Sequence, residues 1–184
     1  EKTKKSFDEK FYNEEKNCLF DVLGDSKVRP NQLFALSLSH PIVDNAEIAE
    51  QVLNTVENKL LNRYGLKTLS ADEEGYVDVY EGSVYKRDSS YHQGITWPWL
   101  LGLYYDALKN TVLIEKNRAR KQELEEKIIR LVDTTKETFK TEMFERSSIG
   151  TISEIYDSTE PYEERGAFAQ AWSVAEVFRI VLNK

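Results

Sequence analysis

The sequence predicts an all-α fold of about six helices, arranged as half of a double-layered helical barrel. Two observations lead to this fold class. Apolar residues recur at helical spacing in about six segments, and no segment competes with them as a convincing strand. Segments with one apolar face also alternate with segments that are apolar around most of their circumference. Helical hairpins that wrap an outer ring around an inner ring produce this alternation, and a compact six-helix bundle is the alternative.

Three segments with a single apolar face are the expected outer helices. The first covers residues 6–18 and begins at Ser6, which suits an N-cap. The second covers residues 45–64 with Asn45 as its cap. The third covers residues 117–143 and is highly charged on its outer side. Each should lie at the surface with its apolar stripe turned inward.

Three other segments have almost no polar face and are the expected inner helices. They cover residues 31–39, residues 98–108, which begin with a favoured first-turn proline, and residues 167–182. Because six helices make only half of a twelve-helix barrel, inner-helix surface should remain in need of a partner. We expect that partner to be a preceding, N-terminal half of the barrel. The start at Glu1, without an initiator Met, suggests a piece of a longer polypeptide.

Composition predicts a single unit over residues 1–184 and excludes several classes of partner. A hydrophobic content of 40% in 184 residues supplies one well-buried core. A formal net charge of −7 without a large basic cluster argues against nucleic acid or anionic membranes as partners. The single Cys18 cannot form an intrachain disulfide, and no apolar run approaches the ~20 residues that span a bilayer. We therefore expect a cytoplasmic protein without membrane association.

Two long connections, residues 65–97 and 144–166, are the expected functional regions, because structureless loops beyond ~12–15 residues are uncommon. Both precede inner helices, so a double-layered barrel would bring them to the same rim. Aromatic faces stack on the C–H patches of a pyranose, while carboxylate and guanidinium groups bind its hydroxyls. The first connection, with the helix start after it, holds many such groups: Asp72, Asp78, Tyr80, Glu81, Tyr85, Arg87, Asp88, Tyr91, His92, Gln93, Trp97 and Trp99.

Several other kinds of site are not expected. We assign Trp99 to core packing. For Trp97, packing in the core and contact with a ligand both stay open. His40 and His92 lie far apart without metal-ligand spacing, so no metal site is predicted. No glycine-rich phosphate-binding motif is present, which argues against a nucleotide cofactor. Cys18 has no local base that would activate it as a nucleophile.

Glu154 is the candidate carboxylate of the second connection. It lies between apolar residues in a Gly-flanked loop, just ahead of an expected inner helix. Such a carboxylate can project into a pocket. From the local sequence alone, a capping or ion-paired role is favoured.

One long motif and several shorter ones stand out along the chain. The long motif is R-D-x-x-Y-H-Q-G-x-x-W-P-W at residues 87–99. The shorter ones are Arg29-Pro30-Asn31-Gln32, Gly65-Leu66-Lys67-Thr68-Leu69, Tyr80-Glu81-Gly82, Ser153-Glu154-Ile155-Tyr156-Asp157 and Gln170-Ala171-Trp172-Ser173. Their order and approximate spacing resemble the amylo-α-1,6-glucosidase domain of glycogen debranching enzymes, over most of the chain. The long motif is the most specific part of the resemblance.

The resemblance implies a glucoamylase-like (α/α)6 barrel and a glycoside hydrolase of glycogen catabolism. Its substrate would be α-1,6-linked glucose at the branch points of glycogen or another branched α-glucan, without a cofactor. Inverting hydrolysis requires an acid and a base whose carboxyl groups lie ~6.5–9.5 Å apart. By resemblance, Glu154 is the general base. Substrate-binding residues implied in the same way are Tyr80, Arg87, Asp88, Tyr91, His92, Gln93, Trp97 and Gln170.

The general acid of this family lies in the preceding half of the barrel, so the chain by itself is expected to be inactive. Two departures from the family pattern affect individual contacts. Phe11-Tyr12 stands where the family has Phe-Trp, and residues 162–167 replace a Gly- and Pro-rich approach to Gln170. Two alternative functions stay open: a non-catalytic α-glucan-binding module, and a helical interaction domain whose aromatic residues serve only packing.

Overall fold

The structure is a computed structural model that describes residues 2–146 and 149–182. The helices of this part are α1 (Lys2–Lys10), α2 (Phe34–Ser37), α3 (Ala46–Lys59), α4 (Val84–Ser90), α5 (Leu100–Ile114), α6 (Arg118–Glu145) and α7 (Ala171–Leu182). The strands are β1 (Tyr12–Asn13), β2 (Cys18–Leu19), β3 (Leu61–Asn62), β4 (Gly65–Lys67), β5 (Thr96–Trp97), β6 (Ile155–Tyr156) and β7 (Glu164–Arg165). The fold is mostly α, as predicted.

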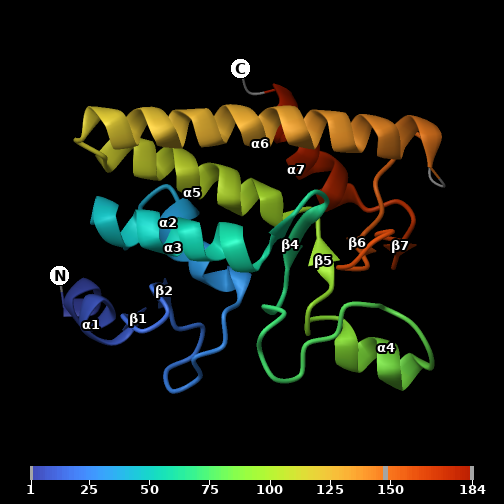
Figure 1. Ribbon diagram of the computed structural model, residues 1–184, viewed down its shortest axis with the longest axis horizontal. Coiled ribbons are helices and arrows are strands. Elements are labelled where there is room, and N and C mark those ends of the chain that lie inside the picture. The colour runs from blue at the N-terminus through green and yellow to red at the C-terminus, as the bar shows by residue number, and fades with distance from the viewer. Residues whose placement is uncertain (1, 147–148, 183–184) are drawn as a thin grey trace.

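Helix α5 occupies the centre of the helical layer (Figure 1). It packs against α2, α3, α6 and α7. Its buried residues include Leu101, Gly102 and Ala107, which lie at widely separated positions around the helix axis. The interior position predicted for residues 98–108 is therefore confirmed, and the helix continues to Ile114.

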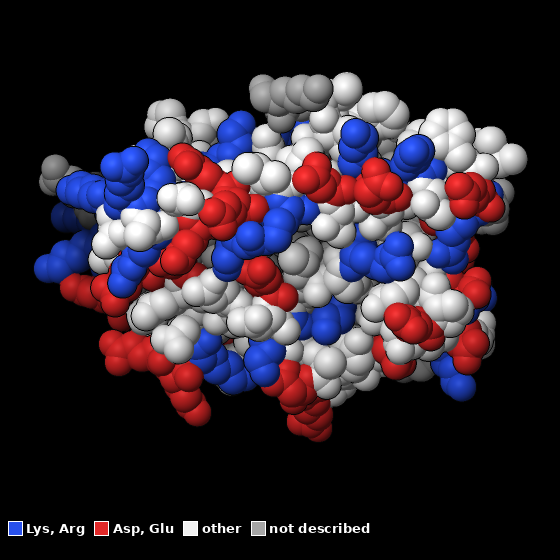
Figure 2. All heavy atoms as spheres, turned by 45° about the horizontal axis from the view of Figure 1, so that its top comes forward, with Lys and Arg blue, Asp and Glu red and all other residues white. Residues whose placement is uncertain are grey.

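Helices α3 and α6 begin at asparagine caps, of which only the Asn45 cap was predicted. Helix α3 ends at Lys59 and not at residue 64, because the chain continues into strand β3. The Asn45 side chain accepts hydrogen bonds of 2.9 and 3.2 Å from two backbone N–H groups in the first turn of α3. Asn117 accepts two bonds of 3.0 and 3.2 Å at the start of α6. Acidic and basic side chains are interspersed over the face that α6 presents to solvent (Figure 2).

The expectation that no strands form was wrong. A five-stranded antiparallel sheet has the order β3-β4-β5-β6-β7. Each of these strands has two or three residues, which is too short for an alternating apolar pattern to appear in the sequence. Strands β4 to β7 lie within the two long connections, which are therefore ordered by backbone pairing, and β3 lies just before the first connection (Figure 1).

The first helix was misplaced. It covers Lys2–Lys10, so the predicted cap Ser6 lies in its middle. The chain then forms a hairpin in which Asn13 pairs with Cys18. The Asn13 side chain accepts hydrogen bonds from the backbone N–H groups of Glu15 and Lys16, which stabilises the turn.

The helices predicted over residues 31–39 and 167–182 are shorter and less buried than expected. A 3₁₀ turn at Pro30–Leu33 precedes the single-turn helix α2. Helix α7 begins at Ala171, and the large apolar side chains of Phe168, Trp172 and Phe178 are exposed. Exposed apolar surface on α7 is what a half-barrel would leave, but the barrel itself stays a prediction.

None of the helices in the described ranges combines the length and the apolar character needed to cross a lipid bilayer.

Candidate functional site

The sheet brings the two long connections into contact. Strand β5 pairs with β4 through Leu66 and Trp97, and with β6 through Thr96 and Tyr156. The Thr96 hydroxyl lies 2.7 Å from the Ser158 hydroxyl, and the Asn62 amide donates to Thr96 at the same distance. These contacts fix the segment just after Glu154 against the end of the long motif.

A pocket lies where these segments meet. Its volume is about 280 Å³, close to the lower end of the ~300–1,000 Å³ range of small-molecule sites. The residues that line it are Pro30, Asn31, Thr68, Tyr91, His92, Trp97, Trp99, Leu100, Glu154 and Trp172. Segments from five separate regions of the sequence therefore contribute to one cavity.

Glu154 is held at the edge of the pocket by hydrogen bonds to both carboxylate oxygens. The Ala167 backbone N–H donates to Oε2 at 3.0 Å, and the Gln170 side chain donates to Oε1 at 3.1 Å. The Glu154 backbone N–H donates in turn to the Ala167 carbonyl at 2.9 Å. A carboxylate has about four acceptor positions, so each oxygen can still accept a bond from a ligand or a water molecule.

Gly166 permits the close approach of the segment after β7 to the segment that carries Glu154. Its φ angle is +70°, in the left-handed region that favours glycine. A Cβ atom added there would overlap Glu154 Oε2 and lie 3.0 Å from Ile155 Cγ1. Glycine therefore leaves the space that the Glu154 carboxylate occupies.

Aromatic rings form the wall beside Glu154. The His92 and Trp97 rings stack with their centroids 5.1 Å apart and an interplanar angle of 13°. Tyr91 meets Trp97 edge-on at 4.7 Å. Trp99 and Trp172 stack at 5.5 Å and 25°, and Trp172 is 45% exposed. A wall of this kind offers ring faces to the C–H patches of a sugar.

Two titratable groups in the wall are kept neutral. Burial, followed by the proximity of Glu154, raises the pKa of Tyr91. Burial lowers the pKa of His92, and the positive charge of Arg29 lowers it further. A neutral imidazole and a phenol can each both donate and accept hydrogen bonds, as recognition of hydroxyl groups requires.

The structure brings part of the predicted site together. Tyr91, His92, Trp97 and Glu154 line the pocket, and Gln170 binds the Glu154 carboxylate.

Two other predicted residues support the pocket without lining it. The Gln93 side chain accepts a hydrogen bond of 2.9 Å from Arg29, which also donates to the Thr68 carbonyl at 3.0 Å. The Tyr80 ring packs on Tyr91 with a centroid distance of 5.5 Å.

Arg87 and Asp88 are not brought to the pocket. Both belong to α4, which lies apart from the helical layer (Figure 1). Arg87 donates to the Gly82 carbonyl at 2.9 Å, and Asp88 is exposed.

Sequence reasoning missed several lining residues. Trp99 was assigned to the core, but it is only half-buried and lines the pocket, whereas Trp97 is 3% exposed. Trp172 was placed on a buried helix, and no role was given to Asn31. The proximity of Trp172 to Gln170 in the sequence was the available signal, since both lie at the start of one helix.

Asp157 is a nearby carboxylate with a structural role. It is 3% exposed and accepts two hydrogen bonds from Arg165, at 2.8 and 3.0 Å. It also accepts the Tyr80 backbone N–H at 2.8 Å. Among the described residues, Glu154 is the only carboxylate that lines the pocket. The same residues contain no cluster of three or more His, Cys, Asp and Glu that could hold a metal ion.

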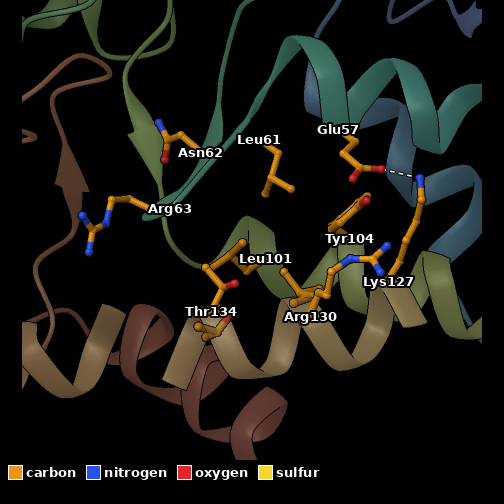
Figure 3. A pocket seen from close by; sticks show the side chains of 11 residues that line it. Glu57, Leu61, Asn62, Arg63, Leu101, Tyr104, Lys127, Arg130 and Thr134 are labelled. Carbon is orange, nitrogen blue, oxygen red and sulfur yellow. Dashed lines mark hydrogen bonds and ion pairs between the residues drawn. The ribbon is translucent and has the colours of Figure 1, made fainter. Parts of the chain in front are cut away.

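A second groove lies between α3, α5 and α6 (Figure 3). It has a volume of about 180 Å³ and an apolar floor that includes Leu61 and Leu101. The Glu57–Lys127 ion pair lies at one end, beside Tyr104. No residue predicted to bind substrate lines this groove, so we do not include it in the candidate site.

Comparison with known families agrees with this geometry. The model of one family, described as amylo-alpha-1,6-glucosidase, matches residues 1–179. The match includes the long motif, the sheet, the Glu154 loop and most of α7. The chain belongs to the amylo-alpha-1,6-glucosidase family.

Proposed function

We propose that this chain is the C-terminal part of a glucosidase that hydrolyses α-1,6-linked glucose at the branch points of glycogen or a related α-glucan. In this proposal Glu154 is the general base of an inverting reaction. The observation that carries it is the position of Glu154, whose two oxygens are oriented by hydrogen bonds at the edge of an aromatic pocket.

The chemistry follows from that arrangement. The ionised Glu154 carboxylate takes a proton from a water molecule as the water attacks the anomeric carbon. A second carboxylic acid, on the other side of the scissile bond, protonates the departing oxygen. Hydrogen bonds from Ala167 and Gln170 keep the carboxylate aligned with the attacking water.

The second carboxyl group must come from elsewhere. No carboxylate other than Glu154 lines the pocket in the described ranges, and Asp157 is fixed by Arg165. We therefore place the general acid in an upstream half of the barrel, contributed by a longer polypeptide. On this view the isolated chain binds sugar but does not hydrolyse it.

Sugar binding is assigned to the aromatic wall. His92, Trp99 and Trp172 present ring surfaces, and the buried Trp97 ring supports His92 by stacking. The Tyr91 hydroxyl supplies a polar group close to Glu154. Stacking places the pyranose, and hydrogen bonds select its orientation.

The test is glucose release from a branched limit dextrin. The intact polypeptide should release glucose, and Glu154→Gln should reduce the rate by about 10²-fold or more, since general base catalysis contributes ~10²–10⁴-fold. Glu163→Gln is the matched control, because Glu163 is exposed on the same hairpin and does not line the pocket. Full activity in Glu154→Gln would refute the assignment.

A non-catalytic α-glucan-binding module is the second candidate, and the single carboxylate of the pocket favours it. Titration of the chain with a maltooligosaccharide, followed by tryptophan fluorescence, tests binding directly. An inactive intact polypeptide with a fluorescence response would favour the module over the enzyme.

A further inference from the structure

Glu142 is an acidic residue buried beneath the hairpin that carries Glu154. It lies on the inner face of α6 and is 0% exposed. A buried carboxylate destabilises a fold unless it is hydrogen-bonded or ion-paired, and an apolar residue of similar size is often better for stability. We therefore expect a specific hydrogen bond or ion pair to the buried Glu142 carboxyl group.

That contact is with the strand directly after Glu154. The Tyr156 hydroxyl donates a hydrogen bond of 2.8 Å to Glu142 Oε1. Tyr156 is itself fully buried and stacks on Tyr64 at a centroid distance of 4.5 Å and an angle of 16°. Tyr156 thus fixes strand β6 in two ways, through the hydrogen bond of its hydroxyl group and through the stacking of its ring.

The other strand of the hairpin is anchored by Arg146, the residue directly after α6. Arg146 lies four residues after Glu142 and forms an ion pair with Glu164 of β7 at 2.6 Å. It also lies 3.5 Å from Glu142 and donates to the Tyr64 hydroxyl at 2.6 Å. Tyr156 and Glu164 are directly paired across the two strands.

These anchors act on both segments that hold the Glu154 carboxylate. Glu154 directly precedes β6, and Gly166 and Ala167 directly follow β7. The Ala167 N–H that orients Glu154 therefore moves with the anchored strand. No atom of Glu142 lines the pocket, so any effect on the reaction must pass through the hairpin.

We propose that Glu142 is a positioning residue, which sets the orientation of Glu154 by anchoring the β6–β7 hairpin to α6 through Tyr156. The inference rests on the proposed role of Glu154, while the anchoring itself can be measured separately. Burial raises the pKa of Glu142, which agrees with its isolation from solvent.

The test compares Glu142→Leu, Glu142→Gln and Tyr156→Phe in the intact polypeptide. Glutamine keeps an oxygen that accepts the Tyr156 hydroxyl, whereas the other two changes remove the hydrogen bond. Glu142→Leu and Tyr156→Phe should lower kcat by roughly 10- to 100-fold, because small misplacements of a catalytic group cost about that much. KM should change by less than about threefold, and Glu142→Gln should recover most of kcat. Glu145→Gln, an exposed change on the same helix, is the control.

Amide hydrogen exchange gives a readout that does not depend on activity. In Glu142→Leu, exchange should accelerate in residues 152–167 and stay unchanged in α5, because only the hairpin loses its anchor. Equal acceleration in α5 would show a general loss of stability and overturn the proposal. Unchanged exchange in residues 152–167 would also overturn it.

The two proposals fail in different ways. If Glu154→Gln abolishes glucose release and Glu142→Leu leaves kcat intact, the glucosidase assignment stands and the positioning role is refuted. If the intact polypeptide releases no glucose, the proposed function fails. Local acceleration of exchange in residues 152–167 would then still support the anchoring, and its absence would refute it.

Discussion

Gly166→Ala is the change that most selectively disturbs the Glu154 carboxylate. The new Cβ atom would overlap Glu154 Oε2 and lie 3.0 Å from Ile155 Cγ1. Glu154 has to move away, and it then loses the 3.0 Å hydrogen bond from the Ala167 N–H. The backbone is also strained, because φ is +70° at this position.

Two magnitudes follow from this geometry. A non-glycine residue in the left-handed region costs roughly 1–2 kcal/mol, and each kcal/mol lowers Tm by about 2–4 °C in a domain of this size. A displaced catalytic group lowers the rate by about 10²-fold. We therefore expect a modest loss of stability together with a large loss of kcat.

Gly24→Ala separates the two effects. Gly24 has φ +87° and no atom within 4 Å of an added Cβ, so alanine there causes the backbone strain without an overlap. Thermal unfolding and glucose release by the intact polypeptide are measured for both variants. Similar Tm losses with a loss of activity confined to Gly166→Ala are expected. Equal activity in the two variants would show that the carboxylate position at Gly166 does not matter for the reaction.

Three further predictions concern the sugar-binding wall and two buried polar groups. Trp172→Ala should weaken maltooligosaccharide binding about 10-fold, which corresponds to ~1.4 kcal/mol of lost stacking. Phe178→Ala is the control and should leave binding unchanged, because Phe178 is similarly exposed on the same helix but lies outside the pocket. Asp157→Asn should lower the free energy of unfolding by about 1–2 kcal/mol, because it weakens the charge-assisted hydrogen bonds from the partly exposed Arg165, and denaturant unfolding measures this. Burial, and then the neighbouring carboxylate of Glu115, raise the pKa of Glu50 to about 7. Because the folded state then binds the proton more tightly than the unfolded state does, stability should fall as pH rises from about 4.5 to about 7. Glu50→Gln should flatten this dependence, by no more than about 1 kcal/mol because the Glu50 side chain is only half-buried, as urea unfolding at pH 5 and pH 7.5 can measure.

The long helices could be predicted because their apolar spacing and caps are local features. Helix α6 runs from Arg118 to Glu145 where residues 117–143 were expected, and the Asn45 cap of α3 is present. Such helices contain enough turns for the 3.6-residue period to be visible. The Glu154 loop could be located through a motif, although its local sequence favoured a simple capping role.

The sheet and the complete pocket depend on contacts between distant residues and could not be predicted in the same way. Strands of two or three residues carry no periodic signal, so the pairing of Thr96 with Tyr156 was invisible in the sequence. Trp99 and Trp172 were assigned to packing because an apolar residue at helical spacing looks the same on a core face and on a ligand face. Arg87 and Asp88 belong to the most specific motif, yet α4 carries them away from the pocket.

The anomer of the glucose first released by the intact polypeptide tests the role of Glu154 most directly. A general base that activates water on the face opposite the departing oxygen must give β-glucose from an α-linkage. Proton NMR spectra recorded in the first minutes, before mutarotation, distinguish the two anomers. The account predicts β-glucose from the unaltered polypeptide and from Glu163→Gln, with release lost in Glu154→Gln. Initial release of α-glucose would contradict it, since Glu154 would then act as a nucleophile or not at all.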